Sequence, residues 1–160
     1  MSVTTRTTTL TVLSDEEIAI TRDFAAPREL IFDLHTRPEH VTKWLLGPEG
    51  WSMPTCEIDL RPGGAWHFGW RNVDGDELEM TGEFTEVVRP ERYVNTERWG
   101  GEWPETLHTT TFTERGGITT VTQVVRYPSK ADRDAALATG MMSGVERSHA
   151  LLDELVAQVP

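Results

Sequence analysis

Short runs of alternating apolar and polar residues, separated by glycine or proline, fill the middle of this chain and constrain its fold most. In one such run Trp66, Phe68 and Trp70 stand at every second position, directly after the turn sequence Arg61-Pro-Gly-Gly64. Side chains alternate between the two faces of a strand, so the three aromatic rings are predicted to point to one face. Glycine supplies the backbone angles that a tight turn between two strands needs.

The other runs extend this pattern along the chain. Strands are predicted over residues 17–24, 56–60, 66–70, 78–84, 93–99, 106–113 and 118–127. Asp74-Gly75 and the segment Glu114–Gly117 mark two tight hairpins between them. The threonine-rich segment Thr4–Thr11 is predicted to be an edge strand, the alternative being a frayed tail within residues 1–13.

Helical signals interrupt the strands in two places. Pro27 can occupy the first turn of a helix that carries Leu30, Ile31 and Leu34, and Thr36 with Glu39 fits a capping box for a second helix that ends near Trp44. After Pro128, Ser129 can cap a short helix, and a longer helix is predicted from Met141 to about Ala157. The order predicts an α+β fold, in which a curved antiparallel sheet of about six to seven strands is covered by the long C-terminal helix.

Length and charge narrow the possible functions. The chain has 160 residues, so a single domain spanning 1–160 is expected. Its 26 acidic residues outnumber 15 lysines and arginines, for a net charge of −11, which argues against nucleic acids and anionic membranes as partners. The single cysteine allows no intrachain disulfide, and no leader or membrane-length apolar run is visible, so a cytoplasmic protein is expected.

Three stretches together resemble a known family. They are RDFAAPRELIFDLHTRPEHVTKWLLGPEGW, DLRPGGAWHF and VDGDELEMTGEFTEVVRPERYVNTERW, and the C-terminal TGMMSGVERSHALLDELV extends the similarity. Their order and spacing are similar to the activator of heat-shock protein 90 ATPase homologue family, of the START-like, helix-grip superfamily (also called SRPBCC). The resemblance implies a sheet that grips a long helix around an internal cavity. Superfamily members carry lipids, bind hormones, cyclise polyketides or assist a chaperone, so the resemblance implies no single activity. The eukaryotic co-chaperone has a separate N-terminal domain for which this chain has no room, which argues against chaperone activation.

Aromatic and polar residues on the predicted inward face are the candidate ligand contacts. Apolar contact is expected from Trp66, Phe68, Trp70, Met80, Phe84, Tyr93, Met142 and Val145, and polar contact from Asn95, His108 and Gln123. Ligand pockets are commonly lined by aromatic rings with a few placed polar groups. Plain core packing or a solvated sheet edge is the alternative for any of them.

Catalytic and metal-binding signatures are weak. No phosphate loop, Gly-x-Ser-x-Gly or His-Glu-x-x-His motif occurs, no cofactor is expected, and none of the five histidines has a metal-ligand spacing to another. His35 and His40 are expected to face solvent, and Cys56 to pack as a small apolar residue. An inward Glu97 with a raised pKa could be a general acid with His108 as its partner. We adopt the other interpretation, in which a bulge turns Glu97 to solvent.

Three functions follow. The leading one is a non-catalytic protein that holds a hydrophobic or amphipathic small molecule between the sheet and the C-terminal helix. The second is a cyclase, dehydratase or hydrolase that uses Glu97 or His108 in the same cavity. The third is a stress-related protein that binds a chaperone through its sheet surface. An exposed edge strand could also pair two copies as a homodimer.

Overall fold

The computed structural model describes residues 7–159. Eight antiparallel strands form its sheet, in the order β1-β2-β8-β7-β6-β5-β4-β3. The strands are β1 (Thr9–Val12), β2 (Glu17–Phe24), β3 (Trp51–Ile58), β4 (Ala65–Asn72), β5 (Glu77–Val88), β6 (Arg92–Glu97), β7 (Thr106–Arg115) and β8 (Ile118–Arg126). The helices are α1 (Arg28–Thr36), α2 (Pro38–Trp44), α3 (Lys130–Ala138) and α4 (Met141–Ala157). The predicted α+β fold with a long C-terminal helix is confirmed.

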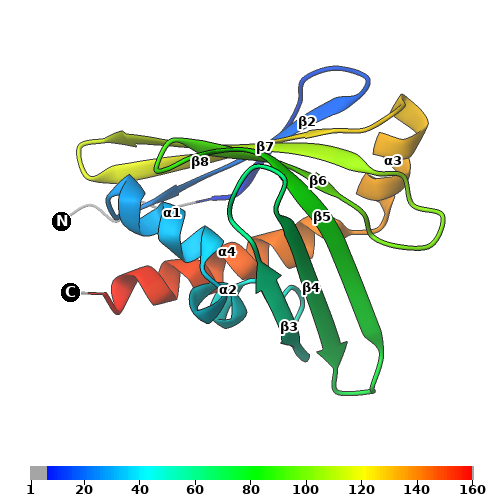
Figure 1. Cartoon of the computed structure of the whole chain (residues 1–160), viewed down its shortest axis with the longest axis horizontal. Helices are drawn as coiled ribbons and strands as arrows, with labels where there is room; N and C mark the ends of the chain where they lie inside the picture. The colour runs from blue at the N-terminus through cyan, green and yellow to red at the C-terminus, as the bar shows by residue number, and fades with distance from the viewer. Residues whose placement is uncertain (1–6, 160) are drawn as a thin grey trace.

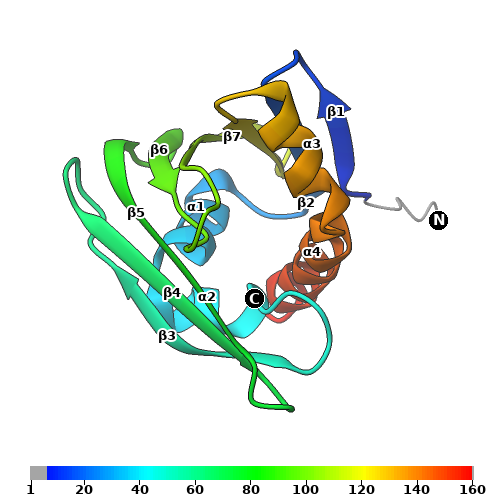
Figure 2. The same cartoon turned by 90° about the vertical axis from the view of Figure 1, so that its right-hand side faces the viewer.

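The sheet wraps around one side of the molecule, and α1, α2 and α4 lie on its inner side (Figure 2). The hairpin of β3 and β4 together with β5 forms an arm that projects away from β7 and β8 (Figure 1). Because β2 pairs with β8 over its whole length, from Glu17 opposite Arg126 to Phe24 opposite Thr119, the first long strand joins the last. This topology leaves β1 and β3 as the two edges of the sheet.

The main core lies where α1 and α4 meet the sheet. Phe24, Phe32, Phe112 and Leu152 are almost fully buried there and belong to one cluster. A second cluster packs Ile18, Ile20 and Val125 against the start of α4, and a third lies under the β3–β5 arm. The sheet and α4 therefore meet firmly at one end, and the arm is supported by its own smaller cluster.

Of the two predicted side-chain caps, one is confirmed and one is wrong. Ser129 caps α3, since its Oγ accepts a hydrogen bond from the backbone N–H of Asp132 at 3.1 Å. The capping box of Thr36 and Glu39 is wrong, because the N-cap of α2 is Arg37 and has no side-chain bond. The Thr36 hydroxyl instead donates to the carbonyl of Phe32 at 2.9 Å, which closes α1 rather than opening α2.

Two strand predictions need extension. The sheet has eight strands instead of six to seven, and β3 covers Trp51–Ile58 instead of the predicted residues 56–60. The edge strand predicted over Thr4–Thr11 is present as β1 from Thr9, and residues 4–6 lie outside the described part of the chain. Within residues 7–159, no helix combines the length and the apolar character that a bilayer-spanning segment requires.

Candidate binding cavity

A cavity of about 570 Å³ lies between the inner face of the sheet and the layer formed by α2, the segment that follows it and α4. The predicted contacts that line it are Trp66, Phe68, Trp70, Met80, Phe84, Tyr93, Asn95, His108, Gln123 and Val145. Met142 is the exception: the residue of α4 that lines the cavity at this point is Met141, and Met142 packs beside the second core cluster. The predicted strand phase is therefore correct on β4, β5, β6, β7 and β8.

The wall of the cavity is aromatic. All six tryptophans of the chain line it, on α2, β3, β4 and the segment after β6. Three of the indole N–H groups donate to backbone carbonyls: Trp44 to Leu34 at 2.8 Å, Trp66 to Thr96 at 3.1 Å and Trp70 to Leu45 at 2.8 Å. These bonds satisfy the only polar atom of each ring, so the rings present apolar surface to the cavity.

The Trp66 indole needs the glycine opposite it. Trp66 pairs with Gly82 across β4 and β5. A Cβ atom built on Gly82 would overlap both the carbonyl oxygen of Thr96 and the indole nitrogen of Trp66. The missing side chain therefore lets the indole cross β5 and reach the backbone of β6.

The polar part of the wall is a hydrogen-bonded group on β6, β7 and β8. The amide nitrogen of Gln123 lies 2.8 Å from Nδ1 of His108, so Nδ1 accepts and the ring proton is on Nε2. His108 Nε2 then reaches Thr106 Oγ1 at 2.8 Å and Glu97 Oε2 at 3.2 Å. The indole N–H of Trp99 donates to the same carboxylate oxygen at 2.8 Å.

The structure corrects the interpretation of Glu97. Its carboxylate points inward and lines the cavity, and no bulge turns it to solvent, since Glu97 pairs with Thr106 in the regular ladder of β6 and β7. Burial raises the pKa of this carboxyl, but the His108 Nε2–H that points at it and the hydrogen bond from Trp99 outweigh burial, so the net pKa is lowered. Glu97 is therefore ionised at neutral pH, which contradicts a raised pKa and a resident general-acid proton.

The negative charge of Glu97 contributes to raised pKa values at two tyrosines. Burial raises the pKa of Tyr93 to about 12, and the charge of Glu97 adds to this while a hydrogen bond with Thr110 opposes it. Burial and the same charge raise the pKa of Tyr127 to about 12. Both phenols consequently remain neutral hydroxyls beside an anionic carboxylate.

A second polar region, formed by His35 and His149, was not predicted from the sequence. His35 does not face solvent: it lines the cavity from α1, and its Nδ1 donates to the carbonyl of Ile31 at 2.8 Å. Burial lowers the pKa of His35 to about 4, and burial together with His35 and Arg22 lowers the pKa of His149, on α4, to about 3. The sequence could have predicted the inward side chain of His35, because it lies four positions after the apolar Ile31 and therefore on the same helix face. His40, on α2, is half-exposed.

The segment between α2 and β3 forms the rim opposite the sheet. The backbone N–H of Gly47 donates to the buried hydroxyl of Ser148 at 3.0 Å, and Arg147 donates to the carbonyl of Gly47 at 3.0 Å. A Cβ on Gly144 would lie only 3.3 Å from Cδ of Pro48. Gly144 therefore allows a close approach of α4 to this rim.

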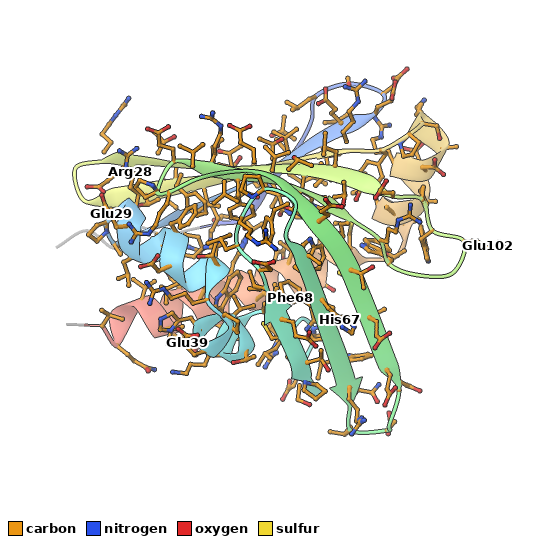
Figure 3. All side chains as sticks on the ribbon, in the orientation of Figure 1. Arg28, Glu29, Glu39, His67, Phe68 and Glu102 are labelled. Atoms are coloured by element: carbon orange, nitrogen blue, oxygen red, sulfur yellow. The ribbon has the colours of Figure 1, made fainter. Side chains whose placement is uncertain are left out.

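The remaining histidine and cysteine side chains lie apart from the polar group on β6, β7 and β8. Within residues 7–159, no cluster of three histidine, cysteine or acidic side chains is placed to hold a metal ion. Cys56 is half-buried, and burial together with the negative charge of Glu39 raises the pKa of its thiol to about 11. His67 points away from the cavity, unlike its neighbour Phe68 on β4 (Figure 3), and lies 3.4 Å from Glu79 on the outer face.

Known proteins that resemble this chain share its fold. Residues 25–157 match the family model described as Activator of Hsp90 ATPase homolog 1-like protein. Among solved structures, a protein from Rhodobacter sphaeroides is 26% identical with a TM-score of 0.91, and the alignment covers 96% of this chain and 99% of that chain. Protein Ms6760 from Mycobacterium smegmatis is 25% identical with a TM-score of 0.85 and the same coverage. The AHSA1 protein from Silicibacter pomeroyi, 22% identical over 88% of this chain and 97% of its own, shares the fold with a TM-score of 0.73. A search of curated proteins found no match.

Proposed function

This chain belongs to the Activator of Hsp90 ATPase homolog 1-like family, and from that premise we propose that it is a binding protein for a hydrophobic or amphipathic small molecule. The observation that carries the proposal is the cavity of about 570 Å³, whose wall contains every tryptophan of the chain. A volume of this size lies within the range of sites that hold drug-sized ligands. The fold alone does not select this function, since one fold hosts many activities.

The arrangement of the wall supports an amphipathic ligand. Trp66, Phe68 and Trp70 offer a continuous aromatic surface on β4, with ring centroids 4.7 Å and 5.9 Å apart along the strand. Glu97, His108 and Gln123 supply the polar contacts at another part of the same wall. An apolar body and a polar group on one ligand would then each meet a matching surface.

Two measurements test this function. Native mass spectrometry of the purified full-length protein, with solvent extraction of any adduct, identifies a resident ligand. Titration with Nile red, a neutral apolar dye, tests an empty cavity, and we expect saturable one-to-one binding that quenches tryptophan emission by energy transfer.

A variant that fills the cavity gives the control. Val145 lines the cavity from α4, so Val145→Phe places a ring in the space that the dye would occupy and should abolish the binding. Val73→Phe makes the same change on a turn residue that is 86% exposed and should bind the dye like the wild type. Absence of both an adduct and saturable dye binding, or equal binding by Val145→Phe, would refute the proposal.

A second candidate function rests on the Glu97–His108 pair. A carboxylate beside one nitrogen of an imidazole stabilises the imidazolium formed when the other nitrogen takes a proton, as in a general base. Here the other nitrogen, Nδ1, accepts from Gln123, so a substrate would have to displace that amide. An enzyme of the cyclase, dehydratase or hydrolase type could use it. Conversion of an extracted ligand or a close analogue by the wild type, lost in His108→Gln while Nile red still binds, would favour this alternative.

A further inference from the structure

The charged groups of the cavity wall are of one sign. Among residues 7–159, Glu97 is the only aspartate or glutamate that lines the cavity, and no lysine or arginine of this range lines it. His35, His108 and His149 are the other titratable groups that could carry a positive charge, and the first and last are held neutral by burial. His108 Nδ1 accepts a hydrogen bond from the Gln123 amide, and its Nε2 faces Glu97, so the ring is already engaged by protein groups on both nitrogens.

The Glu97 carboxylate has capacity left for a ligand. Its Oε2 accepts from His108 and from Trp99. No side chain or backbone N–H of residues 7–159 donates to Oε1, although a carboxylate oxygen can accept more than one hydrogen bond. A ligand that donates to Oε1 would complete this group without displacing any protein contact.

One indole ring contacts this carboxylate, and a second indole ring packs on the first. Trp99 donates to Glu97 through its ring edge, and the ring of Trp103 lies 5.0 Å from that of Trp99, centroid to centroid, at an angle of 56°. Both rings line the cavity, and Trp103 is 39% exposed on the segment between β6 and β7, whose outer end is marked by Glu102 in Figure 3. The faces of indole rings attract cations, and paired aromatic rings with a nearby carboxylate are a recurring arrangement for alkylammonium groups.

From these observations we propose that the ligand of this cavity is an amphiphile with an ammonium group, held between the Glu97 carboxylate and the rings of Trp99 and Trp103, with its apolar part along the β4 aromatic surface. This inference rests on the proposed binding function and specifies its ligand class. The same wall disfavours fatty carboxylates: no lining cation would pair with them, Glu97 would repel them, and the chain as a whole carries a net charge of −11.

The test uses three probes that differ only in the head group: decylammonium, decan-1-ol and decanoate, each titrated into the full-length protein against Nile red below the micelle concentration. At neutral pH the first is cationic, the second neutral and the third anionic. We expect the ammonium probe to displace the dye at a concentration about tenfold lower than the alcohol, and the carboxylate to be the weakest. Equal displacement by all three, or tightest binding of decanoate, would overturn the ligand class while leaving the binding function in place.

Variants of two glutamates separate the local charge from the overall charge. Glu97→Gln keeps the shape and should reduce the preference for the ammonium over the alcohol from about tenfold to about threefold, the share that the indole rings supply, while it improves decanoate. Glu105→Gln changes the net charge equally at an exposed site next to Arg98, 3.4 Å away, and should keep the wild-type preference. Nile red binding by both variants shows that the cavity is still formed.

The ring contribution is tested at the exposed member of the pair. Trp103→Leu should weaken the ammonium probe about threefold or more and leave the alcohol nearly unchanged. If Glu97→Gln retains the full tenfold ammonium preference of the wild type, the ammonium assignment is wrong. If Nile red and all three probes fail to bind the wild type, the proposed function fails together with it.

Discussion

His35 shows how one side chain on an amphipathic helix can make stability depend on pH. Burial in the cavity wall lowers its pKa to about 4, against a small opposing effect of its bond to the Ile31 carbonyl. The unfolded chain takes up a proton near pH 6.5, whereas the folded chain resists it until about pH 4. The free energy of unfolding therefore falls as pH drops through this window, by up to about 3 kcal/mol.

We predict that His35→Gln and His35→Leu both flatten this dependence, because neither replacement takes up a proton on unfolding. Urea unfolding of the wild type and both variants across that pH window measures the slope directly. His149, with its pKa lowered to about 3, contributes a slope of the same sign and similar size, so each variant should keep about half of the dependence. A variant slope equal to that of the wild type would show that His35 is not buried as the structure describes.

Glu97 marks the limit of what the sequence could say about single residues. Its phase with Tyr93 and Asn95 predicted an inward side chain, and this part is confirmed. His108 was also named as its possible partner, but a bulge was preferred because a slip of one residue would turn the side chain to solvent, and the bond from Trp99 was not anticipated. Those partners come from another strand and a loop, and only the three-dimensional register of β6 and β7 brings them within hydrogen-bond distance.

At the scale of elements, the contact between β4, β5 and β6 depends on Gly82. We predict that Gly82→Ala lowers the free energy of unfolding by about 2 kcal/mol, because the new methyl group overlaps the Trp66 indole and the Thr96 carbonyl. The neighbouring Thr81→Ala, on the exposed face of β5, should change it by only a few tenths. Chemical denaturation of both variants checks this, and a tolerated Gly82→Ala would mean that the indole does not cross the strand there.

The rim of the cavity depends on α4 in the same way. Ser148→Ala leaves the backbone N–H of Gly47 without its acceptor, so we expect a loss of about 1–2 kcal/mol and faster amide exchange at Gly47. Ser143→Ala, on an exposed turn of the same helix, removes a bond to the Gly140 carbonyl and should leave exchange at Gly47 unchanged. Equal exchange rates in the two variants would show that Ser148 does not hold the rim.

For the whole molecule, strand period and turn chemistry were sufficient to predict the architecture. Alternation from Glu17 to Phe24 and from Trp66 to Trp70 placed the right side chains inside, because period two leaves no other choice once one face is buried. The cavity was expected chiefly from the family resemblance, which implies a sheet that grips a long helix around an internal space. Its rim was not predictable, since Gly47 and Ser148 are 101 positions apart and neither belongs to a periodic pattern that signals their contact.

All six tryptophans line one cavity, so the intrinsic fluorescence of the protein should report ligand binding there. We predict that saturation with decan-1-ol lowers the acrylamide quenching constant of the wild-type emission, because a bound chain occupies the space through which the quencher reaches the indoles. A residual quenchable fraction should persist from Trp103, which is 39% exposed. In Val145→Phe the constant should already be low and should not respond to the alcohol, whereas Val73→Phe should respond like the wild type. If the alcohol binds to the wild type and the quenching constant does not change, the ligand lies outside this cavity, and the aromatic wall is core packing rather than a binding surface.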